Sequence, residues 1–197
     1  VNDVFETANH FRCLDWVLDT ISEPLSEEYV KQMHRILKAG LMTQQNPEVV
    51  IGDYKKYANV VGGIETAKPG EVSAQMAQLL QTYQNLQQPD FYEIAWFHMA
   101  FEKIHPFYDG NGRVGRLLLL KMCLENDIVP FYINSESKMF YYAGLKEWQT
   151  QGKPNRLLDV FLSMHDMKAV LDYFEIDYDH TETISSALVE QHKNWKL

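Results

Sequence analysis

The sequence has little cysteine, no excess of basic residues and no long hydrophobic run. Two of its 197 residues are cysteines, Cys13 and Cys123, and both lie in apolar helical contexts. We therefore expect reduced core thiols rather than a disulfide or a metal site. Acidic residues outnumber basic ones by 27 to 18, and a formal net charge of −9 argues against nucleic acid as a general partner.

No apolar run approaches the length of a membrane span, and the N-terminus lacks the basic and apolar regions of a signal peptide. These absences predict a cytoplasmic protein without a membrane segment. Because the chain begins with Val1 rather than methionine, we expect it to be part of a longer protein.

Apolar residues make up 46% of the chain, as in ordinary globular proteins, and the length suits one domain. Most of the sequence has helical periodicity, and start signals such as Ser26 and the Asp90–Glu93 capping box precede several of the helices. The expected helices cover residues 4–20, 27–40, 71–86, 91–104, 111–125, 138–149 (capped by Ser137) and 154–173. Strand-forming residues on both sides of Gly62 and Gly63 predict a small hairpin. The expected fold class is all-α, with one β-hairpin.

The stretch IHPFYDGNGRVGRLLLL, from Ile104 to Leu120, carries the chemistry. Glycines at 110 and 112 allow the backbone to turn sharply and approach a ligand closely just before a helix begins. The N–H groups at a helix start bind anions. Arg113 and Arg116 are three residues apart, so both can reach the same phosphate chain.

Two further residues of this stretch fit the same interpretation. Asp109 would repel a bare phosphate, but it makes sense as a ligand of Mg²⁺ that bridges phosphate oxygens. His105 is the nearby group whose pKa suits removal of a hydroxyl proton, and Phe107 would anchor the loop in the core. Each feature alone is commonly structural: a plain turn, a solvated arginine pair or a loop histidine. Their concentration in twelve positions predicts a Mg-nucleotide site with a general base.

The same residues reproduce the signature H-x-F-x-[D/E]-G-N-G-R-x-x-R without departure, and here the sequence resembles the Fic domain family. The resemblance implies a helical bundle with a β-hairpin flap over the active site. It places a Fic domain at residues 1–180, with its core at about 26–175, and a C-terminal helical tail at 181–197. It also implies a nucleotidyltransferase that moves AMP from Mg-ATP to a Ser, Thr or Tyr hydroxyl of a target protein and releases pyrophosphate.

The resemblance also assigns roles to the motif residues. His105 would be the base and Asp109 the Mg²⁺ ligand. The α- and β-phosphates would be held by Gly110, Asn111 and Gly112. Arg113 and Arg116 would bind phosphates, with Arg116 reaching the γ-phosphate.

Two regions outside the motif match the family less specifically. Asn59, Val60, Val61 and Gly62 would form the flap, which covers the nucleotide and aligns a target segment along residues 59–64 by strand addition. An ordinary surface hairpin is the alternative. Tyr141 and Tyr142 would line the adenosine pocket with Gln149 near the adenine, although helical aromatics are often core residues.

Control in this family often depends on a helix whose glutamate pairs with the second motif arginine. The opening VNDVFET resembles the helix that follows such a segment, which places the inhibitory helix upstream of residue 1. A second candidate is Ser186–Glu190, where Gln191 stands in place of the family's Gly or Asn. An inhibitor on a separate protein is the third alternative.

Two other functions stay open at this stage. A nucleotide-sensing regulatory module would bind ATP without transfer, although it would not need His105. A Fic transferase could also use another donor, such as UTP, GTP or CDP-choline. Self-modification is expected, whereas the target protein, the donor base and homo-oligomer formation are left undecided by the sequence.

Overall fold

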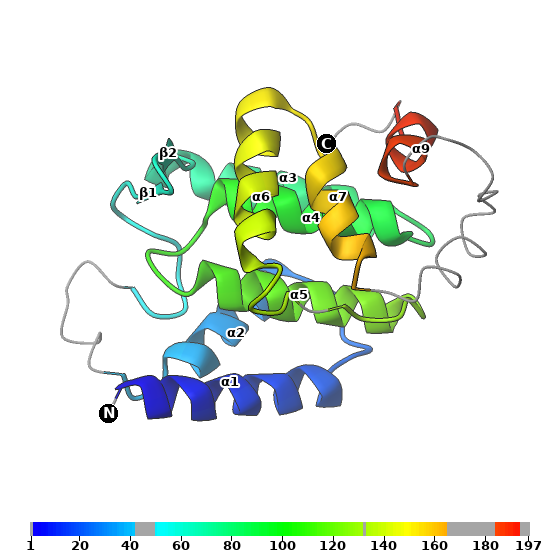
Figure 1. The fold of residues 1–197 in the computed structure, drawn as a ribbon. Helices are drawn as coiled ribbons and strands as arrows, with labels where there is room; N and C mark the ends of the chain where they lie inside the picture. The colour runs from blue at the N-terminus through cyan, green and yellow to red at the C-terminus, as the bar shows by residue number, and fades with distance from the viewer. Residues whose placement is uncertain (1, 42–49, 132, 165–183, 194–197) are drawn as a thin grey trace. The chain divides into compact units, whose positions relative to one another are not determined.

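The computed structural model describes residues 2–41, 50–131, 133–164 and 184–193, and Figure 1 shows their path. They form two compact units that divide after Ile128. Helices dominate both units, and a two-stranded antiparallel sheet is the one sheet formed by the described residues. The expected all-α class with a small hairpin is confirmed. No helix in the described ranges is long and apolar enough to cross a membrane.

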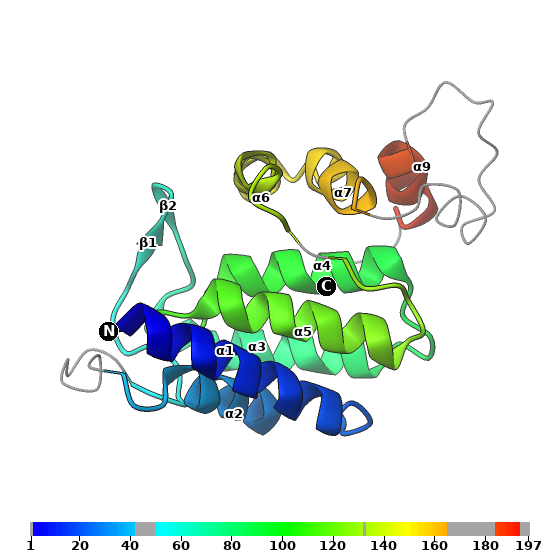
Figure 2. The ribbon, with the colours of Figure 1, turned by 60° about the horizontal axis from the view of Figure 1, so that its bottom comes forward.

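The first unit is built around α4 (Phe91–Ile104) and α5 (Asn111–Glu125), which lie side by side in Figure 2. The other helices of this unit are α1 (Asn2–Asp19), α2 (Glu27–Lys38) and α3 (Pro69–Gln84). Both α1 and α2 contact α5, while α3 packs on α4. The leucine-rich helix is therefore central, as its composition predicts, and burial of its apolar side chains stabilises the unit.

The start signals at Ser26 and Asp90 act as the sequence predicts. The Ser26 hydroxyl accepts a hydrogen bond from the Tyr29 N–H at 3.2 Å, and Asp90 and Glu93 make both bonds of a capping box. Helix α3 begins at Pro69, two residues before the predicted start, because proline fits the first helical position. Both cysteines are free and buried, as expected.

The hairpin pairs β1 (Val60–Val61) with β2 (Ile64–Glu65), with Val61 opposite Ile64. Gly62 and Gly63 between the strands have φ angles of 59° and 81°. A two-residue turn with both φ angles positive matches the twist of a hairpin and favours glycine at both positions. The hairpin stands away from the helices of its unit in Figure 2.

The second unit contains α6 (Lys138–Gln151), α7 (Asn155–Leu162) and α9 (Ile184–Gln191). Helices α6 and α7 approach closely at Gly144, where an added Cβ would lie 3.0 Å from the Leu157 backbone. Ser137 occupies the N-cap of α6, but its side chain makes no capping bond. Instead, the Asn134 side chain accepts a hydrogen bond from the Ser137 N–H at 2.8 Å.

The predicted helix from 154 to 173 is wrong as a continuous element, because α7 ends at Leu162. The Ser163 hydroxyl donates to the Val160 carbonyl at 2.7 Å, which a continuing helix would pair with the Met164 N–H. The Met164 N–H bonds to Phe161 O instead and tightens the turn. Residues 165–173, and the predicted domain boundary at 180, lie outside the described residues.

Candidate active site

The motif loop runs from the end of α4 to the start of α5. Its first residue, His105, has a left-handed backbone with φ 51° and ψ 62°, and its last, Gly110, has φ 87°. Phe107 between them is fully buried and stacks on the His34 ring at a centroid distance of 4.0 Å. The expectation that Phe107 anchors the loop is confirmed.

Asn111 closes the loop on itself. Its side-chain oxygen accepts a hydrogen bond from the Phe107 N–H at 2.8 Å, and its amide donates to the Phe107 carbonyl at 2.7 Å. The side chain is buried and fully committed to these bonds. Asn111 therefore shapes the loop. The Gly110 and Arg113 N–H groups are bonded to Asp109 and to the Gly110 carbonyl, so the N–H groups of Asn111 and Gly112 are the ones that could bind an anion at this helix start.

A chain of charges surrounds Asp109. Its carboxylate accepts hydrogen bonds from the fully buried Lys38 ammonium and from the Gly110 N–H. Lys38 also lies 3.6 Å from Glu6 of α1, and Glu6 pairs with Arg113 at 2.9 Å. Partial burial raises the pKa of Asp109, but the bond and charge of Lys38 outweigh it and hold that pKa below its usual value. Asp109 is therefore an ionised and half-exposed carboxylate.

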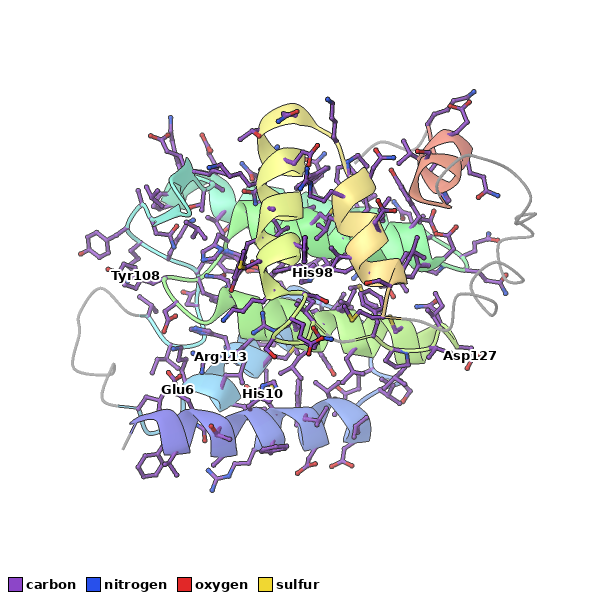
Figure 3. The ribbon with its side chains drawn as sticks, in the orientation of Figure 1. Glu6, His10, His98, Tyr108, Arg113 and Asp127 are labelled. Carbon is purple, nitrogen blue, oxygen red and sulfur yellow. The ribbon has the colours of Figure 1, made fainter. Side chains whose placement is uncertain are left out.

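Arg116 has a different environment from Arg113. It makes no ion pair with any residue of the described ranges, whereas Arg113 is paired with Glu6. Burial lowers the pKa of His10 on α1, and the charges of Arg116 and Arg113 lower it further. Figure 3 shows Glu6 and His10 on the side of α1 that faces Arg113. The charges of both motif arginines thus act on the same region near His10. Glu6 neutralises the charge of Arg113, whereas no ion pair within the described ranges neutralises that of Arg116.

His105 is held neutral by its surroundings. Burial lowers its pKa to about 4, and the nearby charge of Lys55 contributes, while the Glu102 carbonyl and Asp109 partly oppose the shift. The imidazole is thus unprotonated at neutral pH and able to accept a proton.

A second network ties the hairpin to the motif loop. The Asn59 side chain donates to the carbonyls of Phe107 and Tyr108, at 3.2 and 3.4 Å. Its oxygen accepts from the buried Lys55 ammonium at 2.8 Å and from the Thr66 hydroxyl at 2.5 Å. Lys55 also donates to the Ile104 carbonyl at 3.3 Å. Asn59 is thus bonded to the motif loop, while Val60 and Val61 remain exposed and Gly62 forms the turn.

The predicted adenosine residues lie in the second unit, on α6. Tyr141 is buried and packs against Tyr142 and Phe161, with centroid distances of 5.3 and 6.2 Å. Tyr142 is exposed, and Gln149 is half-buried. Tyr141 is thus a core residue of its own unit, and Tyr142 is the aromatic of the pair that is open to a ligand.

Sequence reasoning missed several charged residues around the motif, namely Glu6, Lys38, Lys55 and Glu102. Burial lowers the pKa of Lys55 to about 8, and burial raises the pKa of Glu102 to about 7 despite the opposing charge of Arg116. One signal was available for Lys38, which follows His34 by one helical turn on the buried face of α2.

Comparison with known proteins agrees with this fold and motif. Residues 24–123 match the Fic/DOC family, which is just over half of the chain. The chain belongs to the Fic/DOC family.

Individual relatives match over shorter stretches. A probable protein adenylyltransferase of Aquifex aeolicus is 47% identical over 51 residues, 26% of this chain and 15% of that protein. The protein adenylyltransferase Fic of Aedes aegypti is 31% identical over 98 residues, 48% of this chain and 20% of that protein. The chain thus matches a fifth or less of the length of these two relatives.

Solved structures share the fold. A Fic domain containing signaling protein from Bacteroides thetaiotaomicron aligns with a TM-score of 0.65 and 23% identity, over 98% of this chain and 70% of that one. Fic-1 from C. elegans aligns with a TM-score of 0.67 and 21% identity, over 88% and 50%. At these identities the likeness concerns the fold.

Proposed function

We propose that this chain carries the catalytic site of a protein adenylyltransferase that moves AMP from Mg-ATP to a Ser, Thr or Tyr hydroxyl. The observation that carries the proposal is the neutral, largely buried His105, set in a left-handed conformation in the loop that leads to the N-terminus of α5 and its two arginines. A base beside an anion site is the arrangement that nucleotidyl transfer requires. The relatives named protein adenylyltransferases support the same reaction.

The proposed reaction is a single displacement. The hydroxyl of the target gives its proton to His105 while its oxygen bonds to the α-phosphorus of ATP. The bond from that phosphorus to the bridging oxygen breaks, and pyrophosphate leaves. The α5 N-terminus, Arg113 and Arg116 stabilise the negative charge on the phosphates. Arg116, which lacks an ion pair among the described residues, binds the γ-phosphate.

Asp109 fits a single-carboxylate Mg²⁺ site. It is ionised and half-exposed, and no group of three or more His, Cys, Asp or Glu side chains in the described ranges could hold a metal without the nucleotide. Mg²⁺ commonly takes one or two carboxylates and completes its shell with phosphates and water. When bound, the cation would neutralise charge on the phosphate oxygens. We expect Asp109→Ala to remove the effect of EDTA on ATP affinity measured by calorimetry.

The hairpin is the proposed docking site for the target. Val60 is 62% exposed and Val61 44%, and their two-residue strand has a free edge for an extended segment. Asn59 fixes this edge to the motif loop, so a docked hydroxyl would be held in register with His105. The inhibitory helix is proposed to lie upstream of residue 1. Glu190 on α9, which is exposed and pairs with Lys193, and a separate protein are the alternatives.

The test is incubation of the chain with Mg²⁺ and ATP labelled at the α- or the γ-phosphate. The proposal predicts that the α-label enters the protein, that the γ-label leaves as pyrophosphate, and that His105→Ala reduces incorporation about 10²–10⁴-fold. The same assay with UTP, GTP and CDP-choline decides the donor. ATP binding without incorporation, with the parent and with added protein extracts, would instead favour a nucleotide sensor.

A further inference from the structure

One buried carboxylate beside the motif has no part in the reaction described so far. Glu102 lies in the last turn of α4, and only 8% of its surface is exposed. Its Oε1 atom makes no hydrogen bond with the residues that the structure describes. A buried acceptor left unpaired costs about 1–3 kcal/mol. Glu102 therefore does not stabilise the fold through this oxygen, and its presence here needs a functional explanation.

The space for this carboxylate depends on a glycine. A Cβ added to Gly115 of α5 would lie 2.6 Å from Oε1 of Glu102, well inside contact distance. The Gly115 carbonyl is in turn bonded to the His98 ring at 3.2 Å. Helices α4 and α5 thus meet at a position that accommodates the acid, although alanine at 115 would favour the helix.

One polar neighbour of Glu102 is the proposed base. Oε2 of Glu102 lies 3.9 Å from Nδ1 of His105, and Nδ1 is the other buried atom here without a well-formed hydrogen bond in the described residues. A separation of 3.9 Å is about 1 Å longer than a hydrogen bond. Catalytic hydrogen bonds are often long in the free enzyme and shorten when substrate binds. The Glu102 carboxylate, whose other oxygen is unpaired, and Nδ1 of His105 are therefore an acceptor and a donor that a small movement would bring into hydrogen-bond distance.

We propose that Glu102 is the positioning residue of His105: its carboxylate accepts a hydrogen bond from Nδ1–H and so leaves Nε2 free to take the target's hydroxyl proton. The proposal rests on the proposed function. When Nε2 gains the proton, the ring becomes an imidazolium that the carboxylate stabilises, and the proton later leaves to water. The same division of roles holds a catalytic histidine in hydrolases.

The charges around the pair agree with this role. Arg116 from α5 favours the ionised form of Glu102, while Lys55 opposes and Asp109 favours protonation of His105. His98 is buried on the same helix, and burial lowers its pKa to about 4, so it stays neutral. Glu102 is therefore the carboxylate next to His105 that can become ionised in the working pH range.

The test begins with the ring itself, in the full chain at pH 8 with ¹⁵N-labelled histidine. The nitrogen shifts of His105 report which nitrogen carries the proton. We expect Nδ1–H in the parent and in Glu102→Gln, whose amide oxygen still accepts. We expect a shift toward Nε2–H in Glu102→Met, which has similar volume and no side-chain acceptor, while the main-chain carbonyl of residue 102 is the same in all three proteins. An unchanged tautomer in the Met variant overturns the proposal, whether or not the chain transfers AMP.

The kinetic arm uses the transfer assay. Both variants should lower kcat, about 10-fold for Gln and about 100-fold for Met, with KM for ATP unchanged. The parent kcat should rise with pH through the pKa of Glu102, about 7, and this limb should vanish in Glu102→Gln. As a matched control, Glu125→Gln removes a half-buried carboxylate from the other end of the unit and should change neither tautomer nor kcat. Equal kcat in all variants overturns the proposal, while absence of transfer in the parent refutes the proposed function alone.

Discussion

The two ends of α5 are stabilised in different ways. Its C-terminal half is mostly apolar, with Leu118, Leu119 and Met122 buried. Its N-terminal end instead has a left-handed glycine, a buried asparagine and, opposite Gly115, a carboxylate with an unpaired oxygen. Burial of hydrocarbon is the main contribution at the C-terminal end, although the buried Lys121 donates to the Ile21 carbonyl there, whereas directed polar contacts shape the N-terminal end. From this contrast we infer that the C-terminal half of α5 mainly stabilises the fold, while its N-terminal end mainly forms the proposed site.

The largest stability effect is expected at the apolar end. Met122→Ala should lower the free energy of unfolding by about 2–5 kcal/mol, because it leaves a cavity in the core around a fully buried side chain. ATP affinity of the folded protein should stay the same. Urea denaturation and calorimetry measure the two quantities. Met139→Ala is the matched control, since Met139 is 80% exposed and its loss should change stability by less than about 0.5 kcal/mol. A large loss of ATP affinity in folded Met122→Ala would contradict the separation.

Asn111→Ala should cost less stability and more affinity. The change leaves the buried Phe107 N–H without its partner, which costs about 1–3 kcal/mol. The loop then loses its shape, so ATP affinity should fall about 10-fold or more, equivalent to about 1.4 kcal/mol. Asn126→Ala is the matched change at the other end of α5, where the amide bonds to Met122 O and the Tyr83 hydroxyl. Asn126→Ala should reduce stability and leave ATP affinity unchanged. An equal loss of ATP affinity in both variants would contradict the separation of the two ends of α5.

The same contrast explains what the sequence could predict. Apolar periodicity and capping residues locate the helices of the first unit, because burial and capping are recorded in local patterns. The motif also predicts the turn at Gly110. The partners of Lys38 and Lys55 were not predictable, because hydropathy places charged side chains at the surface and Asp109 and the Ile104 carbonyl are distant from these lysines in sequence. The end of α7 was missed for a related reason, since it depends on one hydroxyl bond at Ser163.

A pH titration of stability should resolve the polar end further. Burial lowers the pKa of His98 to about 4, so between pH 6.5 and 4 the unfolded chain binds a proton that the folded chain does not, and stability falls with acidification. Burial raises the pKa of Glu102 to about 7, so between pH 7 and 4.5 the folded chain binds the extra proton and stability rises. Glu102→Gln removes only the second effect. Its stability should therefore fall more steeply than the parent's from pH 7 to 4.5 in urea melts, and parallel curves would contradict the shifted pKa of Glu102.

The smallest expected effect concerns two left-handed residues, His105 after α4 and Asp127 after α5, with φ angles of 51° and 57°. Asp127 ends its helix in a Schellman arrangement, in which the Ile128 N–H bonds to Cys123 O at 2.8 Å. A side chain in this conformation costs about 1–2 kcal/mol, and glycine avoids the cost. At each position the glycine variant should therefore be more stable than the alanine variant, by about 1 kcal/mol, in matched urea melts.

The two positions should nevertheless differ in function. If the proposed AMP transfer is assayed, Asp127→Gly should behave like the parent, because the backbone conformation of this residue only ends a helix. His105→Gly should be the more stable of the two His105 variants and still be inactive, because the proposed base is removed. This result would show that the backbone at position 105 favours glycine, and that the protein has histidine there because the imidazole is needed. His105→Gly and His105→Ala could instead be equally stable while the Asp127 pair differs. The left-handed conformation at His105 would then not be a source of strain, and its explanation would be that it positions the ring.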